Sequence, residues 1–215
     1  MKPPATYHPQ LFDVQSLDDA MRIILTPEDS TTEHRWATET PYLADLIAGA
    51  FELSEQSLVL DYGCGIGRMA KALIERHGCK VIGVDISVSM RALASHYVGS
   101  DRFFACSPPM LDLLAGRGVS VDLGIAVWVL QHCLHPRQDM ARIAGALAPR
   151  GGLFVVNQRA RAIPTVEYGW TSDGADIDTL LREAFAYRGG GPLDAQHTTA
   201  VIAANAYWSA FNPLG

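Results

Sequence analysis

The sequence has no long basic run and no long apolar run, and both absences narrow the classes of protein to consider. Its 215 residues include 23 acidic residues and 17 lysines and arginines, which gives a formal net charge of -6. Binding along nucleic-acid phosphates needs clustered basic side chains, so DNA and RNA are disfavoured as partners. No apolar run approaches the ~20 residues that span a bilayer, and the first residues lack the apolar core of a signal peptide. We therefore expect a cytoplasmic protein with no membrane partner.

Cysteine is scarce and widely spaced. The chain has four cysteines and no C-x-x-C pair: Cys64, Cys79, Cys106 and Cys133. This spacing favours neither a disulfide framework nor a zinc site. His132 and His135 flank Cys133, but no other acids or cysteines stand at metal-ligand spacing, so we expect no bound metal.

A glycine-rich stretch near residue 65 gives the clearest prediction. Leu58–Leu60 is a short apolar run of the kind found in a parallel strand that is buried on both faces. A glycine triplet follows at once, then an apolar stripe at helical spacing, a second apolar run at 81–84, and Asp85. Glycines between a strand and a helix allow a sharp turn and let a ligand approach the backbone. The pattern predicts a strand–turn–helix–strand unit that binds a nucleotide-like ligand, with Asp85 on its ribose.

Two cofactors fit this unit. Gly65-x-Gly67-x-x-Ala70 matches the relaxed dinucleotide pattern G-x-G-x-x-A, which keeps a nicotinamide cofactor open. However, Asp61 stands two residues before the triplet Gly63-x-Gly65-x-Gly67, and this D-x-G-x-G-x-G form resembles motif I of class I S-adenosylmethionine-dependent methyltransferases. Asp85-Ile86-Ser87 resembles the second motif of that family, and Leu147-Ala-Pro-Arg-Gly-Gly152 resembles the turn before its fifth strand.

The resemblance covers about residues 55–157 and implies a fold and a cofactor. The fold is α/β and Rossmann-like, a doubly wound, mostly parallel sheet of seven strands with an antiparallel last strand. The cofactor is S-adenosyl-L-methionine, with its ammonium group near Asp61. The residues expected to bind it are Asp61, Gly63, Cys64, Gly65, Gly67, Asp85, Ile86, Ser107 and Val127.

One element departs from the family pattern. Many relatives offer an acid to the adenine amino group after the third strand, which we expect at 102–106. Here that position is a loop that runs Ser107-Pro108-Pro109-Met110, so Ser107 or a backbone carbonyl would have to take the role.

The remaining chain predicts one domain, at 32–215, preceded by an extension at 1–31. The cofactor-binding core lies at 55–157 and a polar acceptor-side loop at 157–176. We expect helices at 32–39, from Thr40-Pro41 onwards, and near 87–97, 136–147 and 176–184. A strand that runs into a turn or short helix is expected at 121–130, and another strand at 153–156. Two final strands are expected at 185–188 and 198–208, separated by a flexible glycine loop at 189–192.

The acceptor side can be predicted only as a set of candidates. An acid–base group is needed if the methyl acceptor is a hydroxyl or an ammonium, and a histidine suits that task near neutral pH. His132 follows the predicted fourth strand and is the candidate base, with His135 as the alternative. The candidate acceptor-binding residues are Trp36, Tyr42, Tyr168 and Trp170, although each of these also fits ordinary packing.

Three classes of function remain open on these observations. The first is a methyltransferase, a monomer or homodimer, acting on oxygen or nitrogen of a small-molecule or sugar-like acceptor. The second is an NAD(P)-dependent oxidoreductase of Rossmann type, although the chain lacks a Tyr-x-x-x-Lys pairing. The third is a subunit that binds S-adenosylmethionine and activates a partner without catalysing.

Overall fold

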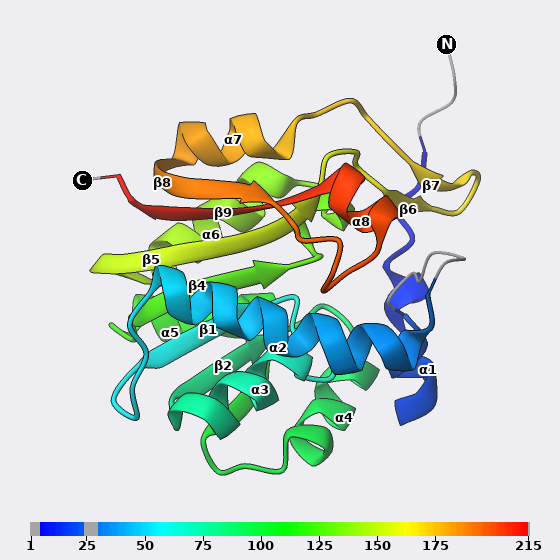
Figure 1. Cartoon of the computed structure of the whole chain (residues 1–215). Helices are drawn as coiled ribbons and strands as arrows, with labels where there is room; N and C mark the ends of the chain where they lie inside the picture. The colour runs from blue at the N-terminus through cyan, green and yellow to red at the C-terminus, as the bar shows by residue number, and fades with distance from the viewer. Residues whose placement is uncertain (1–4, 24–29, 215) are drawn as a thin grey trace.

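The protein is built around one large mixed sheet, seen in a computed structural model that describes residues 5–23 and 30–214 (Figure 1). The seven strands follow the order β3-β2-β1-β4-β5-β9-β8. Their bounds are β1 Leu58–Tyr62, β2 Lys80–Val84, β3 Phe103–Cys106, β4 Val121–Val127, β5 Leu147–Gln158, β8 Phe185–Pro192 and β9 Ala206–Pro213. The strands β3, β2, β1, β4 and β5 pair in parallel, and β9 is antiparallel to both β5 and β8. The predicted Rossmann-like fold with an antiparallel last strand is confirmed.

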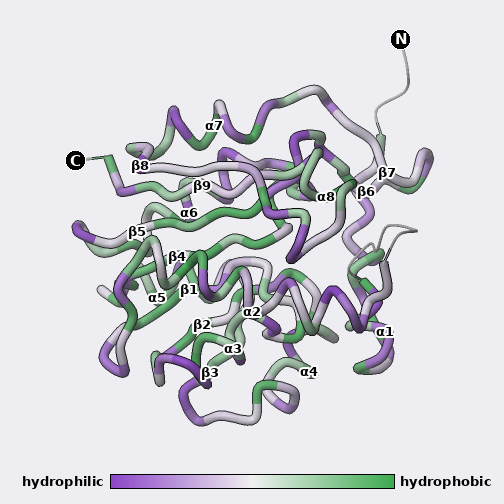
Figure 2. The backbone as a smooth tube through the Cα atoms, viewed as in Figure 1, coloured by the Kyte–Doolittle hydropathy of each residue, from purple (hydrophilic) through white to green (hydrophobic). Residues whose placement is uncertain are grey.

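Helices cover both faces of this sheet. On one face lie α2 Thr32–Ala50, α3 Arg68–His77, α4 Val88–Val98 and the short α8 Ala200–Asn205. The opposite face carries α5 Pro108–Gly116, α6 Pro136–Ala146 and α7 Ile177–Ala184. The central strands are buried between the two layers, so they carry almost only apolar residues, and Figure 2 shows β4 and β5 mostly in the hydrophobic colour.

The order of the strands fixes where a ligand can bind. Strand β1 pairs with β2 on one side and β4 on the other, so the connections leave β1 and β4 in opposite directions. A crevice opens outside the carboxyl ends of two such strands. In Figure 1 the arrowhead of β4 points towards the side where α1 Leu17–Arg22 and a separate hairpin lie. That hairpin consists of β6 Ile163–Thr165 and β7 Gly169–Thr171.

The predicted helices near 87–97 and 176–184 are present, and capping groups fix the ends of several helices. Ser87 accepts a hydrogen bond from the Met90 amide at the start of α4, and Asp176 accepts one from the Asp178 amide at the start of α7. Gly78 ends α3 with a positive φ of 66°. These caps satisfy backbone groups that helix ends leave unpaired.

The predicted break between two helices near Thr40 is wrong. The helix α2 runs without interruption from Thr32 to Ala50, with Pro41 inside it. A proline removes one backbone hydrogen bond, but packing of an apolar face stabilises a helix more than local propensity does. Leu43, Ala44 and Ile47 are fully buried after the proline, so the helix continues across it.

Four more predictions need correction. The predicted strand at 198–208 begins only at Ala206, because Thr199 caps the helix α8 through its hydroxyl. The expected glycine loop at 189–192 is the end of β8. The acceptor-side loop at 157–176 contains the β6–β7 hairpin, and Ser107 begins helix α5 instead of a loop.

The N-terminal segment packs over the carboxyl edge of the sheet. Tyr7 pairs with Thr165 of β6, and the Val14 amide donates to the hydroxyl of Ser89 on α4. Ala20 is buried against this end of the molecule, together with Ile66 and Met90. Residues 1–4 and 24–29 of the expected extension lie outside the described residues.

Candidate active site

One large cavity lies at the carboxyl ends of β1, β2 and β4. Its volume is about 770 Å³, and its walls come from the N-terminal segment, α2, the glycine turn, the ends of these strands, and the β6–β7 hairpin. Pockets that hold drug-sized ligands have volumes of about 300–1,000 Å³. The cavity is therefore large enough for a nucleotide-like ligand.

The glycine turn forms one wall of this cavity. Gly63 has a φ of 74°, a left-handed conformation that glycine adopts without strain, and a Cβ there would overlap the side chain of Val129. Gly65 also has a positive φ, of 53°, but a Cβ there would find only Met90 Sδ, at 4.0 Å. The turn is therefore packed at Gly63 and open towards the cavity at Gly65, where a ligand can approach the backbone.

Asp85 closes the turn from the end of β2. Its Oδ2 accepts from the Gly65 amide and its Oδ1 accepts from the Ser87 amide, each at 2.9 Å. Burial raises the pKa of Asp85, while these two amides favour the ionised form. Each carboxylate oxygen has a second lone pair, so Asp85 can also accept hydrogen bonds from a diol in the cavity.

Asp61 lies deeper, at the base of the glycine turn. It is only 3% exposed, and its Oδ2 accepts from the Ala70 amide in the first turn of α3, at 3.2 Å. Burial raises its pKa to about 7, and the nearby Asp85 adds to this shift, whereas Arg68 opposes it. A cation in the cavity would favour its ionised form.

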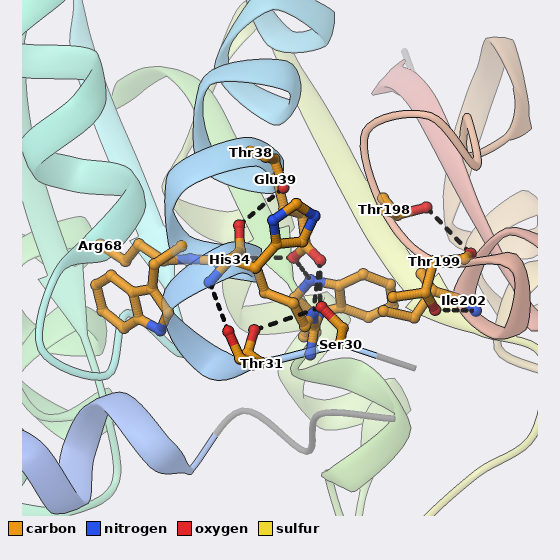
Figure 3. A network of polar contacts seen from close by, with 12 residues as sticks. Ser30, Thr31, His34, Thr38, Glu39, Arg68, Thr198, Thr199 and Ile202 are labelled. Carbon is orange, nitrogen blue, oxygen red and sulfur yellow. Dashed lines mark hydrogen bonds and ion pairs between the residues drawn. The ribbon is translucent and has the colours of Figure 1, made fainter. Parts of the chain in front are cut away.

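A buried ionic cluster forms a second wall (Figure 3). Glu39 of α2 is fully buried and binds Arg35 one helical turn earlier, with both Arg35 Nε and Nη2 donating to its Oε2. Its Oε1 accepts from Arg68 Nη2 at 3.0 Å and from the indole nitrogen of Trp128 at 2.9 Å. The four residues join α2, α3 and the end of β4 beside the cavity.

Trp128 has an unusual backbone in this cluster. Its φ is 62°, and it is the one non-glycine residue with a positive φ in the described ranges 5–23 and 30–214. Such strain persists only where surrounding contacts enforce it, and it is concentrated at functional sites. Here the Trp128 amide donates to the Val156 carbonyl, and the indole donates to Glu39.

His132 faces the cavity from a 3-10 turn, η2 Leu130–His132, that follows β4. Its Nδ1 lies 2.6 Å from the Ala162 carbonyl oxygen, which can only accept, so Nδ1 carries the proton. Its Nε2 is then an acceptor and lies 3.3 Å from the side-chain amide of Gln131. Burial lowers the pKa of His132, and the Arg161 charge lowers it further, while the Ala162 carbonyl opposes the shift.

Two aromatic rings accompany His132. Phe12 of the N-terminal segment and Trp170 of β7 lie with their ring centroids 5.7 and 5.2 Å from the imidazole. Their own centroids are 6.1 Å apart. The three rings give this part of the cavity an apolar wall with one basic nitrogen.

The cavity brings together ten of the fourteen predicted site residues. They are Trp36, Asp61, Gly63, Cys64, Gly65, Asp85, Ile86, Val127, His132 and Trp170.

Four predicted residues do not line the cavity. Gly67 is the N-cap of α3, and the hydroxyl of Ser107 caps α5, leaving Pro108 to line the cavity instead. Tyr42 points away, with its hydroxyl accepting from the Asp194 amide and its ring stacked on His197. Tyr168 lies in the turn between β6 and β7 and is 45% exposed.

The ionic cluster was missed by sequence reasoning. Arg35 and Glu39 stand four residues apart, a spacing that predicts an ordinary pair on a helix surface and gives no sign of burial. Arg68 lies in the glycine stretch, but it belongs neither to the apolar stripe of the helix nor to the acids of the motif, so the pattern gives it no role. Trp128 lies inside a hydrophobic run, at 125–130, and reads as core.

Comparisons with known proteins agree with this geometry. Residues 60–155 match the family model described as a methyltransferase domain. The match covers the glycine turn, Asp85 and the strands up to β5, and it identifies the chain as carrying a class I S-adenosylmethionine-dependent methyltransferase domain. S-adenosylmethionine is thus the cofactor of this methyltransferase domain. A search of curated proteins found no match.

Solved structures share the fold at low sequence identity. The PH0226 protein from Pyrococcus horikoshii OT3 is 18% identical with a TM-score of 0.65, covering 93% of this chain and 100% of that one. A putative sarcosine dimethylglycine methyltransferase from Galdieria sulphuraria is 14% identical with a TM-score of 0.65, covering 87% and 90%. A geranyl diphosphate methyltransferase in complex with SAM is 14% identical with a TM-score of 0.62, covering 92% and 95%.

No helix in the described ranges 5–23 and 30–214 is long and apolar enough to cross a membrane.

Proposed function

We propose that this methyltransferase acts on an oxygen or nitrogen of a small-molecule acceptor. The observation that carries the proposal is the single cavity that holds both the glycine turn with Asp85 and the His132 wall. A cofactor bound beside the glycine turn and Asp85 leaves the space beside His132 for an acceptor. The described residues 159–214 add the β6–β7 hairpin, the helices α7 and α8 and the strands β8 and β9, and within them no separate substrate domain is present, which suits a compact acceptor.

The cofactor-binding residues fit S-adenosylmethionine in their chemistry. Asp85 offers carboxylate oxygens to the ribose hydroxyls, and Gly65 leaves its backbone open to the cavity. Asp61 offers a buried carboxylate to the ammonium group. Ile86 and Pro108 line the cavity at the ends of β2 and β3, where they give apolar contact to an adenine ring.

The chain's contribution to the reaction is mainly positioning. When bound, S-adenosylmethionine supplies a methyl group on a sulfonium that is open to in-line displacement. The acceptor atom must lie about 3 to 3.5 Å from that methyl carbon, and water must be excluded. The apolar wall of Phe12 and Trp170 excludes water on the acceptor side, and Trp128 encloses the end of β4.

His132 is placed to accept the proton that the acceptor loses. Its Nδ1 proton is held by the Ala162 carbonyl, which leaves the lone pair on Nε2. A hydroxyl that donates to Nε2 takes the place of the Gln131 amide. Because burial lowers the His132 pKa, the ring is neutral at pH 7 and ready to act as a base.

Equilibrium binding tests the assignment of the cofactor residues. Calorimetry with S-adenosylmethionine should show binding to the wild-type protein, with NAD much weaker. Replacing Asp85 by Ala removes a charged acceptor, and hydrogen bonds to charged groups contribute ~1.5 to 3 kcal/mol, so affinity should fall by about tenfold to more than a hundredfold. Asp101→Ala, in the exposed turn before β3, is the matched control.

The proposal fails if Asp85→Ala binds S-adenosylmethionine as tightly as the control does. Acceptor class is tested separately, by measuring S-adenosylhomocysteine formation with panels of hydroxyl-bearing and amine-bearing small molecules. Turnover on a protein or RNA alone, with none on either panel, would overturn the small-molecule assignment.

A further inference from the structure

Counted over the described residues 5–23 and 30–214, the buried ionic cluster contains two positive charges and one negative charge. Arg35 and Arg68 are 4% and 7% exposed, and Glu39 between them is 0% exposed. Burial alone would raise the pKa of Glu39, but the charges of Arg68 and Arg35 outweigh it and hold the pKa below its ordinary value. Glu39 is therefore ionised, and two guanidinium groups share one carboxylate.

Glu39 has no capacity left for a further hydrogen bond. An ionised carboxylate has about four lone-pair sites. Oε2 receives Nε and Nη2 of Arg35, and Oε1 receives Nη2 of Arg68 and the indole nitrogen of Trp128. The four sites are filled, so any other donor of the cluster needs a different acceptor.

Arg68 has such a donor. Its Nη1 is buried and has no hydrogen-bond partner within residues 5–23 and 30–214, while Arg68 itself lines the cavity. One face of its guanidinium lies over the Trp36 ring, 5.4 Å from the centroid. An unpartnered charged donor at a buried site is costly, and an anion in the cavity would satisfy both its hydrogen bond and its charge.

Asp61 does not supply that anion. Arg68 is close enough for its charge to lower the Asp61 pKa, but burial still raises that pKa to about 7. Moreover, Asp61 Oδ2 is engaged by the Ala70 amide. The Asp61 carboxyl and the Arg68 guanidinium thus both lie in the wall of the cavity, and Asp61 does not neutralise the charge of Arg68.

We propose that Arg68 Nη1 binds the carboxylate of the methionyl end of the cofactor, with Arg35 as a second charge and Glu39 as the residue that positions both. This inference rests on the proposed function. An α-amino acid carries its ammonium and carboxylate on one carbon, so its two sites must be adjacent. Asp61 precedes the glycine turn and Arg68 follows it directly, which places the acid and the base on either side of the same loop.

The contacts of Glu39 also connect the proposed cofactor side of the cavity with the acceptor side. Glu39 holds Arg68 with the same oxygen that receives the Trp128 indole. Trp128 in turn follows the strand that ends beneath the His132 turn. Glu39 is therefore a positioning residue for a ring that lines the cavity close in sequence to the His132 turn.

Two ligands that differ only at the amino-acid end test the inference. S-adenosylhomocysteine carries the ammonium and the carboxylate, whereas 5′-methylthioadenosine keeps the adenosine and the sulfur and lacks both. Calorimetry should show that Arg68→Met weakens S-adenosylhomocysteine binding by about tenfold to a hundredfold and leaves 5′-methylthioadenosine binding unchanged. Arg76→Met, on the exposed end of the same helix, should change neither affinity.

Three results separate the possible failures. Equal weakening of both ligands by Arg68→Met would show that Arg68 only supports the fold and would overturn the inference. Unchanged binding of S-adenosylhomocysteine would overturn it as well. If the wild-type protein bound neither ligand, the placement of the cofactor would fail instead.

A second variant covers the case in which Arg68→Met does not fold. Arg68→Lys keeps the charge and loses the planar fork of donors. It should weaken S-adenosylhomocysteine binding relative to 5′-methylthioadenosine, by less than the methionine variant would. An unchanged ratio of the two affinities in Arg68→Lys would then overturn the inference.

Discussion

The indole nitrogen of Trp128 donates a hydrogen bond to Oε1 of Glu39, across 2.9 Å. This contact joins the end of β4 to the middle of α2, two elements that are about ninety residues apart in the chain. The residue that makes this contact has a φ of 62°, a strained conformation that persists only where surrounding contacts enforce it. The strained residue is thus fixed from both its backbone and its ring.

Replacing Trp128 by Phe should destabilise the protein while keeping an aromatic ring in place. The variant retains the strained backbone and loses a buried donor to a carboxylate, a contact that contributes ~1.5 to 3 kcal/mol. Thermal denaturation should show a melting temperature lower by about 3 to 12 °C for a domain of this size. Trp208→Phe on β9 is the control, because no hydrogen bond of the Trp208 indole to a carboxylate is present in the described ranges.

Replacing His132 by Ala should affect turnover more than folding. A general base contributes ~10² to 10⁴ in rate, so S-adenosylhomocysteine formation should fall by about a hundredfold or more once an acceptor is known. Cofactor affinity should stay unchanged. His96→Ala, on the exposed side of α4, is the matched control. Normal turnover of His132→Ala, or loss of folding alone, would return His132 to a structural role.

The pH profile of the wild type provides a second readout for His132. Burial lowers the His132 pKa, so the neutral, proton-accepting ring persists to more acidic pH than for a free histidine. Turnover at saturating cofactor should therefore stay level down to pH ~6.5, the ordinary histidine pKa, and decline only below it. A decline that begins above pH 7 would point to another group.

The affinity for S-adenosylhomocysteine should rise with pH between about 5 and 7. In the free protein burial raises the pKa of Asp61 to about 7, so Asp61 is mostly protonated at the lower end of this range. The bound ammonium favours the ionised carboxylate and lowers that pKa, so binding releases a proton and strengthens as the pH rises. The ligand's own amino group, with a pKa of about 7.7–8.0, stays charged throughout.

Two controls isolate Asp61 from its neighbours. Asp85 also has a raised pKa. We expect 5′-methylthioadenosine to bind Asp85 through its ribose without bringing an ammonium group. The pH dependence of 5′-methylthioadenosine binding can therefore be subtracted from that of S-adenosylhomocysteine binding. Asp61→Asn should bind S-adenosylhomocysteine more weakly at pH 7 and remove the difference between the two profiles. An unchanged profile in Asp61→Asn would contradict the assignment of the ammonium to Asp61.

Replacing Gly63 by Ala should damage the glycine turn itself. A Cβ at this position would overlap Val129, and the φ of 74° is unfavourable for alanine. Together the two effects should lower the free energy of unfolding by about 2 to 5 kcal/mol. Gly49→Ala in α2, where a Cβ meets nothing within 4 Å, should instead raise it by about 1 kcal/mol in a denaturant titration.

The sequence predicted the part of the fold whose signals are local. The burial of Val59 and Leu60 on both faces, the turn at Gly63, and the acid at the end of β2 follow from short apolar runs and glycine spacing. The resemblance to methyltransferases then supplied the strand order, which spacing alone does not contain. The match over residues 60–155 and the order of the sheet confirm both.

The errors arose where tertiary contacts outweigh local signals. Pro41 marks a helix start by its type, yet the buried residues on either side keep α2 continuous. Thr198–Asn205 read as strand, although Thr199 caps α8. Ser107 followed by two prolines was a signal for a helix start that could have predicted α5.

The site was predictable on the cofactor side and only partly on the acceptor side. Asp85 and Gly65 come from one continuous stretch, so their contact follows from the motif. Glu39, Arg68 and Trp128 come from segments distant in the chain, and their meeting is set by the packing of α2 across the sheet (Figure 1). No periodicity in the sequence indicates such a contact.

A crystal structure with S-adenosylhomocysteine bound tests the account most directly. We predict the ribose hydroxyls within hydrogen-bond distance of Asp85, at about 2.5–3.0 Å between oxygens. We also predict the ammonium at Asp61, the carboxylate at Arg68 Nη1, and the sulfur facing the space enclosed by Trp128, His132 and Trp170. A ligand whose ribose lies away from Asp85, or whose sulfur faces away from His132, would contradict it.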